Sequence, residues 1–229
     1  IFNGSIRYKL LAIFAGIKDI FQYPLFTSKD IIFQTAKVFT ETHVGKVLST
    51  EPHLSIKEDD VIKAKKSYNI DEQTKNIILG VSASGSTKRW DVENFIKLAV
   101  ELKRFKNCKF FIAAGQKDFK IIDKIKNSEI SNDCISLDHL TIAKILPIIK
   151  NCNLCVSCDT SFMHISAALG IRTIGIFTDS PAYAYSGYTK NIYPIVPEGE
   201  TVESTTHDTL GKDNISFEKV LEKAKSLLV

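Results

Sequence analysis

Short apolar runs alternate with amphipathic stretches from Asn76 to the end of the chain. A loop containing Gly or Ser follows most of the apolar runs, and a stretch with helical spacing comes after the loop. This succession is typical of parallel βαβ units. The predicted strands are 77–81, 109–113, 134–137, 154–157, 173–177 and 192–196. The pattern therefore predicts an α/β fold, a parallel sheet flanked by helices.

The amphipathic stretches predict helices over 92–106, 119–127, 142–150, 162–169 and 217–228. In the first of them, apolar residues recur on one face: Phe95, Leu98, Ala99, Leu102 and Phe105. Thr141 and Ser216 stand where N-cap residues are expected, and Gly170 is placed to end the helix before it. These signals set the boundaries of the predicted helices.

The first 70 residues follow a different pattern. Helical stretches are predicted at 5–15 and 31–43, and a charged helix at 58–68, but no segment shows a complete strand alternation. The polar stretch 69–75 has the composition of a linker. We therefore predict two domains, residues 1–70 as part of an incomplete amino-terminal domain and residues 71–229 as the α/β domain.

Composition excludes several classes of protein. With 229 residues and 44% hydrophobic content the chain can bury a core, and no apolar run approaches the ~20 residues that cross a membrane. The net charge of +4 comes from 30 basic and 26 acidic residues that are interspersed, which argues against nucleic acid as a partner. Five cysteines, an odd number, favour free thiols in a reducing cytoplasm. Because the chain starts at Ile1 without signal-peptide features, we expect it to be a piece of a longer protein.

The loop after the first predicted strand, residues 82–90, is the first candidate for ligand binding. Ligands of an open parallel sheet lie outside the carboxyl ends of its strands. Small residues such as Ser84 and Gly85 let backbone N–H groups approach phosphate oxygens, and Lys88 adds a positive charge. The alternative is a flexible turn with a solvated Lys88, because loops of this composition are common.

A second candidate loop lies between the predicted strand 154–157 and the helix 162–169. The backbone N–H groups of Thr160 and Ser161 are expected at the positive end of the helix dipole, which suits a diphosphate. Asp159 is expected to cap the helix or to accept a hydrogen bond from the loop. His164 is either a donor to a phosphate or ribose oxygen or a packing residue.

Three further features have two interpretations each. Asp118, just after the strand 109–113, could accept hydrogen bonds from ribose hydroxyls or act as the N-cap of the next helix. Cys152, Cys155 and Cys158 have a spacing seen in metal sites, but they overlap a predicted strand, so buried structural thiols are favoured. A tyrosine cluster, Tyr183, Tyr185 and Tyr188, could stack on a base or line a cleft, or could pack at a surface or a domain interface.

Taken together, these loops resemble glycosyltransferase family 9, the heptosyltransferases of the lipopolysaccharide inner core. The family carries a small-residue loop ending in Lys-x-Trp, a Gly-rich turn with an acidic residue, and Asp-Thr-Gly-x-x-His before an Ala-rich helix. Here these motifs correspond to residues 84–90, 115–118 and 159–170, in the same order. Segments 5–11 and 15–18 and Tyr23 resemble the later part of the family's first domain.

The resemblance implies a GT-B architecture, with two Rossmann-like domains facing a cleft. The carboxyl-terminal domain would hold an ADP-sugar through Ser84, Gly85, Lys88, Asp118, Asp159, Thr160, Ser161 and His164. The implied reaction is an inverting transfer of a heptose, or a related sugar, to a lipopolysaccharide core or similar glycan acceptor. Lys88 would stabilise the leaving diphosphate.

The resemblance also implies a cytoplasmic protein, with peripheral association at the inner face of the membrane. No cofactor and no metal are expected, since the chain has no Asp-x-Asp motif. Ser161 stands where the family usually has Gly, and the family's first strand, with its Gly-rich loop and the Asp taken as general base, has no counterpart here. The alternative function is therefore a non-catalytic or fragmentary nucleotide-sugar-binding module. A Rossmann oxidoreductase is disfavoured because no Gly-x-Gly-x-x-Gly is present.

Overall fold

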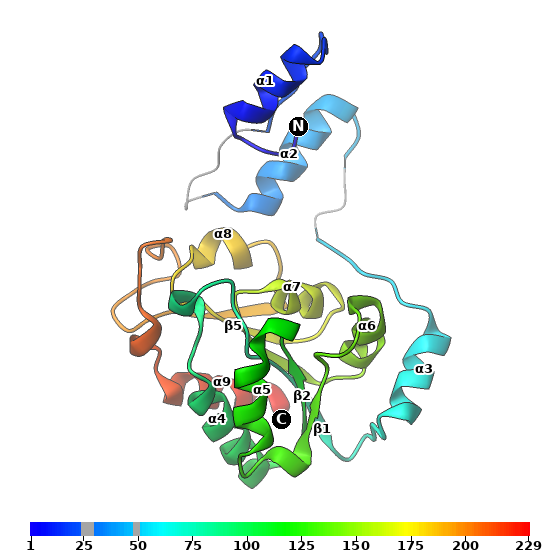
Figure 1. Ribbon diagram of the computed structural model, residues 1–229, viewed down its shortest axis with the longest axis vertical. Helices are drawn as coiled ribbons and strands as arrows, with labels where there is room; N and C mark the ends of the chain where they lie inside the picture. Colours follow the sequence, from blue (N-terminus) through cyan, green and yellow to red (C-terminus); the bar gives the residue numbers. More distant parts are fainter. Residues whose placement is uncertain (24–29, 48–50) are drawn as a thin grey trace.

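A computed structural model describes residues 1–23, 30–47 and 51–229 of the chain (Figure 1). Its centre is a parallel sheet of six strands in the order β3-β2-β1-β4-β5-β6. The strands are β1 Lys75–Gly80, β2 Cys108–Ala113, β3 Cys134–Ser136, β4 Leu154–Cys158, β5 Thr173–Ile176 and β6 Ile192–Ile195. All six lie where the apolar runs predict them, within two residues at each end.

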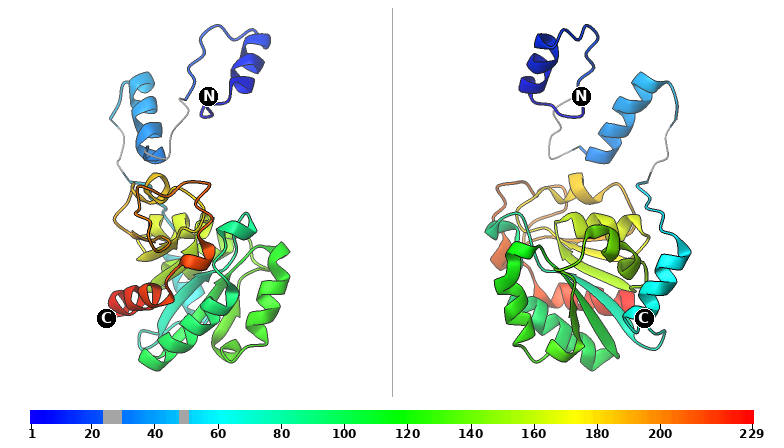
Figure 2. Two further views of the ribbon diagram at one scale, coloured as in Figure 1. Left: turned by 90° about the vertical axis from the view of Figure 1, so that its left-hand side faces the viewer. Right: turned by 45° about the vertical axis from the view of Figure 1, so that its right-hand side comes forward.

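Helices cover both faces of the sheet, as expected for strands that are buried on both sides. One face carries α4 Val92–Phe105, α5 Phe119–Lys126 and α9 Phe217–Leu228. Their apolar residues form one core with the side chains of Ile77, Leu79, Phe110 and Ile112. In the views of Figure 2, α9 lies along the side of the sheet opposite to α6.

The other face carries α3 Glu58–Ser67, α6 Ile142–Lys150 and α7 Ser161–Ala168. Ala64 of α3 and Ile145 and Ile148 of α6 form a second core with Ile78 and Phe111 of the sheet. A short helix, α8 Ala182–Ser186, follows β5 and packs beside β6. Single turns of 3-10 helix lie at Ser86–Lys88, Gln116–Asp118, Ser131–Asp133 and Lys212–Asn214.

The strand order places a topological switch point between β1 and β4. The chain leaves β1 toward β2 and β3 on one side, and it continues from β4 toward β5 and β6 on the other. The two strands pair in register from Ile77 with Leu154 to Gly80 with Ser157. A Cβ at position 80 would come within 2.6 Å of the Ser157 Cβ, so only glycine permits this close approach. The loops that follow β1 and β4 therefore start side by side, which is where such sheets bind ligands.

The amino-terminal helices, α1 Ile6–Phe14 and α2 Ile32–Val44, lie beyond the α8 end of the sheet domain (Figures 1 and 2). Neither helix has a buried residue, although Phe39 of α2 packs edge-on against Phe2 and Tyr23. Within the described part of the first 70 residues there is no strand, in agreement with the sequence pattern. The division at residue 70 stays a prediction, and α3 packs on α6 of the sheet domain.

Two local expectations are wrong. The helical spacing predicts Phe105 on the buried face of α4, but the residue is 41% exposed because it occupies the last position of the helix. The ammonium groups of Lys106 and Lys225 lie over its ring. Thr141 does occupy the N-cap position of α6, but its side chain makes no capping hydrogen bond. Ser216, by contrast, accepts a hydrogen bond from the Lys219 backbone N–H at 3.3 Å, as predicted for the start of α9.

Candidate functional site at the switch point of the sheet

The loop after β1 is anchored at its 3-10 turn and at its carboxyl end. Its 3-10 turn, Ser86–Lys88, is held by the Thr178 hydroxyl, which donates to the Thr87 carbonyl at 2.7 Å. Gly85, just before the turn, has open space around the position of a Cβ. Ser84 is exposed beside it. The loop thus presents small residues to solvent while its last residues are anchored, as a binding loop requires.

Trp90 anchors the carboxyl end of this loop in the core. Its ring is fully buried and packs edge-on against Phe95 of α4 and stacks on Phe217 of α9. The Trp90 backbone N–H donates to the Cys158 thiol at 3.4 Å, which ties the loop to the end of β4. The Trp of the Lys-x-Trp motif is therefore a packing residue that fixes where Lys88 can reach.

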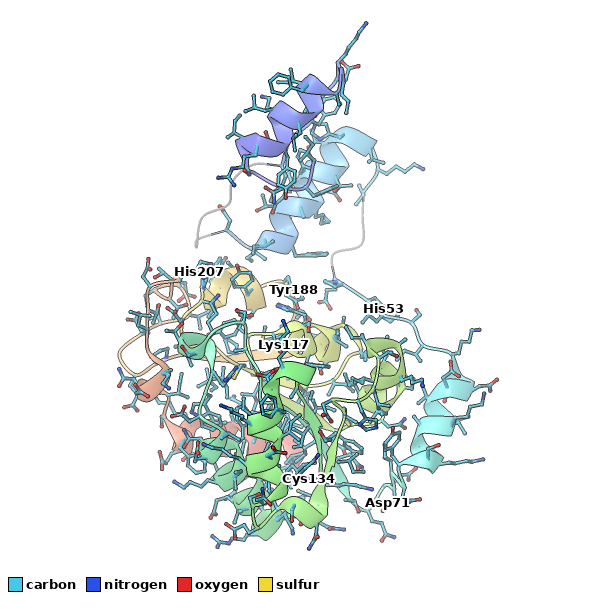
Figure 3. The ribbon with its side chains drawn as sticks, viewed as in Figure 1. His53, Asp71, Lys117, Cys134, Tyr188 and His207 are labelled. Atoms are coloured by element: carbon cyan, nitrogen blue, oxygen red, sulfur yellow. The ribbon has the colours of Figure 1, made fainter. Side chains whose placement is uncertain are left out.

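Lys88 extends toward the loop that follows β6. Its Nζ is 3.5 Å from Nδ1 of His207, and Nε2 of the same ring is 3.4 Å from the Tyr185 hydroxyl. Figure 3 shows His207 and Tyr188 at the end of the domain that faces α2, whereas Asp71 and Cys134 lie at the opposite end. Lys88 thus lies at the carboxyl edge of the sheet, together with the loop after β4.

The loop after β4 leads directly into α7. Thr160 is the N-cap residue, with an extended backbone, and its hydroxyl lies 3.2 Å from that of Ser157. Within the described residues, no hydrogen bond uses the backbone N–H of Thr160 or Ser161. These two N–H groups stay available at the positive end of the helix. Asp159 does not cap α7, contrary to one of its two expected roles, because no side-chain capping bond is formed.

His164, in the first turn of α7, lies between two polar partners. Its Nδ1 is 2.7 Å from the Tyr188 hydroxyl, and its Nε2 is 3.7 Å from Oδ1 of Asp159. The His164 side chain is 36% exposed and the Asp159 side chain 13%. The imidazole of His164 is therefore partly exposed, neither buried in the core nor fully solvated.

Asp118 follows β2 and pairs with a residue of the β1 loop. Its Oδ1 lies 3.2 Å from Nη2 of Arg89, and its Oδ2 accepts a hydrogen bond from the Gly115 backbone N–H at 3.3 Å. Asp118 occupies the N-cap position of α5 without making a side-chain cap bond to that helix. Arg89 thus connects the loops after β1 and β2, and the role of Asp118 toward a ribose stays a prediction.

An apolar pocket of about 530 Å³ lies beside His164, between α2 and the sheet domain. Its walls come from α2, the segment 52–54, α7, α8 and Tyr188, and they include Phe33, Leu54, Ile165, Ala184 and Tyr185. Gly187 lies close to Ile31, the N-cap residue of α2, since a Cβ there would lie 3.0 Å from Cδ1 of Ile31. Tyr185 and Tyr188 therefore line a pocket shared with the amino-terminal segment, and a role in stacking on a base stays a prediction.

Cys152, Cys155 and Cys158 are buried, as the strand pattern predicts. Cys155 belongs to the core between the sheet and α6, whereas Cys158 belongs to the core on the opposite face of the sheet. Burial raises the pKa of the Cys108 thiol to about 11 and that of Cys155 and Cys158 to about 12. Across residues 1–23, 30–47 and 51–229, no three His, Cys, Asp or Glu side chains lie close enough together to hold a metal ion.

These pKa shifts predict inert thiols and a stability loss in alkali. We expect the native chain to react slowly with a thiol reagent at pH 8, and fast once unfolded. Because the folded state keeps its protons while unfolded thiols ionise near pH 9, the free energy of unfolding should fall from about pH 9 up to pH 12. Denaturant unfolding at increasing pH, with reagent kinetics in parallel, measures both. Rapid native labelling at pH 8 would contradict the burial of these groups.

Three contacts at the candidate site are not predicted from the sequence. Arg89 at Asp118, His207 at Lys88, and Tyr188 at His164 each join loops that follow different strands. For Arg89, the only indication in the sequence is its position inside the candidate loop 82–90. His207 comes from the segment after β6, which has no periodic pattern.

The strand order 3-2-1-4-5-6 defines a Rossmann-like domain, with the candidate loops at its switch point. Solved structures of GT-B glycosyltransferases have the same fold. The ADP-heptose LPS heptosyltransferase II of Escherichia coli matches with a TM-score of 0.72 at 18% identity, over 99% of this chain and 75% of that one. A family 9 glycosyl transferase of Veillonella parvula matches with a TM-score of 0.73 at 18% identity, over 91% and 63% of the two chains.

The model of glycosyltransferase family 9 (heptosyltransferase) matches residues 17–212, and the chain belongs to this family. A lipooligosaccharide heptosyltransferase 2 of Campylobacter jejuni is 28% identical over 167 residues, which cover 66% of this chain and 51% of that protein. A second C. jejuni heptosyltransferase 2 is 30% identical over 109 residues, 44% and 33% of the two proteins. The chain thus spans about half, or less, of the length of these relatives. In its described residues no helix is long and apolar enough to cross a bilayer.

Proposed function

We propose that this chain is the donor-binding part of an inverting heptosyltransferase. The donor would be ADP-heptose, and the acceptor a lipopolysaccharide core or a similar glycan. The observation that carries the proposal is the pair of unbonded backbone N–H groups at Thr160 and Ser161, on the same edge of the sheet as the Lys88 ammonium. Together they would supply the backbone donors and the positive charge that a diphosphate requires.

The relatives support the choice of donor and acceptor. The E. coli protein with the same fold is described as an ADP-heptose LPS heptosyltransferase, and another E. coli heptosyltransferase was solved with ADP, at a TM-score of 0.65 and 13% identity. The C. jejuni relatives are lipooligosaccharide heptosyltransferases. A glycan acceptor on a lipid would place the protein on the cytoplasmic side, in peripheral contact with the membrane.

In the proposed reaction an acceptor hydroxyl attacks the anomeric carbon of the heptose. The new C–O bond forms as the bond to the diphosphate breaks, and the hydroxyl proton goes to a general base that we place outside this chain. Negative charge grows on the departing ADP. Lys88 and the α7 amides are positioned to stabilise that charge, and one such donor is typically worth ~3 kcal/mol of the barrier. We propose that this arrangement works without a resident cofactor or a divalent metal.

Calorimetric titration with ADP, UDP and GDP tests the proposal. We expect ADP to bind most tightly and its affinity to be the same with and without magnesium. Equal affinity for the three nucleotides would contradict an ADP-sugar donor. No binding of any of them would refute the proposed function. A strict requirement for magnesium would contradict the metal-free arrangement while leaving nucleotide binding intact.

A further inference from the structure

Three side chains form a line at the start of α7, from Asp159 through His164 to Tyr188. The Tyr188 hydroxyl lies 2.7 Å from Nδ1 of His164, a normal hydrogen-bond distance. On the other side of the ring, Nε2 lies 3.7 Å from Asp159 Oδ1, which is too long for a direct hydrogen bond. One ring nitrogen is thus fully used within the protein and the other is not.

Asp159 selects one form of the imidazole, and the Tyr188 hydroxyl, which can donate or accept, fits that form. A carboxylate only accepts hydrogen bonds, so a lone pair on Nε2 facing Asp159 would be unfavourable. A proton on Nε2 removes that conflict and leaves Nδ1 as the acceptor for the Tyr188 hydroxyl. In this form the Nε2–H is directed to the side of Asp159, and at 3.7 Å it keeps the capacity to donate to another acceptor.

Tyr188 is well suited to act as the donor. Burial, together with the negative charge of Asp159, raises the pKa of Tyr188 to about 12, so the phenol keeps its proton at neutral pH. The two rings are stacked with centroids 5.8 Å apart, and Phe33 of α2 packs against the tyrosine at 5.9 Å. The phenol is therefore held from two sides, and it constrains the rotation of the imidazole.

We propose that Tyr188 is a positioning residue that orients His164 so that its Nε2–H donates to the diphosphate of the bound donor. The proposal rests on the proposed function, because it requires a diphosphate at the start of α7. Tyr188, in the loop after α8, would thus contribute to phosphate recognition through His164, without contacting the phosphate. The groups involved are the phenol O–H, both imidazole nitrogens and the phosphate oxygen.

The first test observes the hydrogen bond directly in the ligand-free chain. Nitrogen-15 spectra of labelled histidine at pH 8, assigned with His164→Ala, should show an unprotonated Nδ1 and a protonated Nε2. Tyr188→Phe removes one oxygen and should move the Nδ1 signal toward that of a nitrogen without a donor. Tyr183→Phe, from α8 of the same segment, is the matched control and should leave the spectrum unchanged. A proton on Nδ1 in the unaltered chain, or no change in Tyr188→Phe, would overturn the proposal.

The second test measures the effect on ligand binding. Tyr188→Phe should weaken ADP binding about threefold to tenfold, the usual effect of one lost neutral hydrogen bond, while Tyr183→Phe does not. In the His164→Ala background the same substitution should have no further effect, because nothing is left to orient. An equal loss in both backgrounds would show that Tyr188 acts independently of His164, which contradicts the proposal.

The two proposals fail in different ways. If the unaltered chain binds no ADP, the proposed function is refuted and the phosphate contact with it. If the unaltered chain binds ADP and Tyr188→Phe binds it equally well, only the positioning role is refuted. Thermal unfolding of each variant confirms that a lost affinity does not come from a lost fold.

Discussion

Replacing Lys88 with Ala should weaken ADP binding strongly and, in a complete enzyme with the proposed activity, lower turnover by about 100-fold or more. Arg89 of the same loop is paired with Asp118, whereas the one hydrogen-bond contact of the Lys88 ammonium in the described structure is with His207. The charge that grows on a departing diphosphate would lose its strongest partner. Calorimetry on the chain and steady-state kinetics on the complete enzyme measure the two effects.

The fold should be unaffected by this change. The hydrogen bond of the Lys88 ammonium to His207 is exposed, so the unfolding temperature of Lys88→Ala should stay close to that of the unaltered chain. Lys120→Ala, which removes an exposed ammonium from α5, is the matched control and should bind ADP normally. If both variants bind ADP like the parent, Lys88 has no part in the site.

Trp90→Ala, unlike Lys88→Ala, should cause a large loss of stability. Truncating a fully buried aromatic residue typically costs about 3–5 kcal/mol. Here the truncation would remove the ring that contacts both Phe95 of α4, edge-on, and Phe217 of α9, stacked. Denaturant unfolding followed by circular dichroism measures the loss. ADP binding should weaken as well, since the loop would lose its anchor.

Phe105→Ala is the control for this substitution. Phe105 lies on α4 like Phe95, but it is 41% exposed, so its truncation should change the unfolding free energy by less than about 1 kcal/mol. Similar losses for Trp90→Ala and Phe105→Ala would mean that the indole is not the centre of packing that its burial indicates.

Local periodicity was sufficient to predict the elements of the sheet domain. Each strand is a short apolar run, and the four central strands β1, β2, β4 and β5 are buried. Each large helix repeats apolar residues every three or four positions, so the signals for an element lie within a few residues of one another. Phe105 shows the limit of this reasoning. Its spacing matches the buried face, but whether a helix end extends past the sheet depends on the length of the neighbouring strands.

The loops of the candidate site could be predicted from the sequence, but the side-chain contacts between them could not. The order of apolar runs places the segments after β1, β2 and β4 at one edge, and composition shows which of them can face phosphates. The partners of Asp118 and His164 could not be found in this way. Helix α4 and strand β2 separate Arg89 from Asp118, and strand β5 and helix α8 separate His164 from Tyr188. These contacts therefore depend on how the chain returns to the carboxyl edge of the sheet.

The anchoring of the β1 loop has a consequence for biosynthesis. Three contacts stabilise this loop: Thr178 with Thr87, Lys212 with Asp91 at 3.2 Å, and Phe217 with Trp90. The loop is translated early, and the residues that stabilise it are translated much later. Contacts of such long sequence separation form late in folding. A nascent chain would therefore complete the proposed nucleotide site only after α9 had left the ribosome and packed on α4.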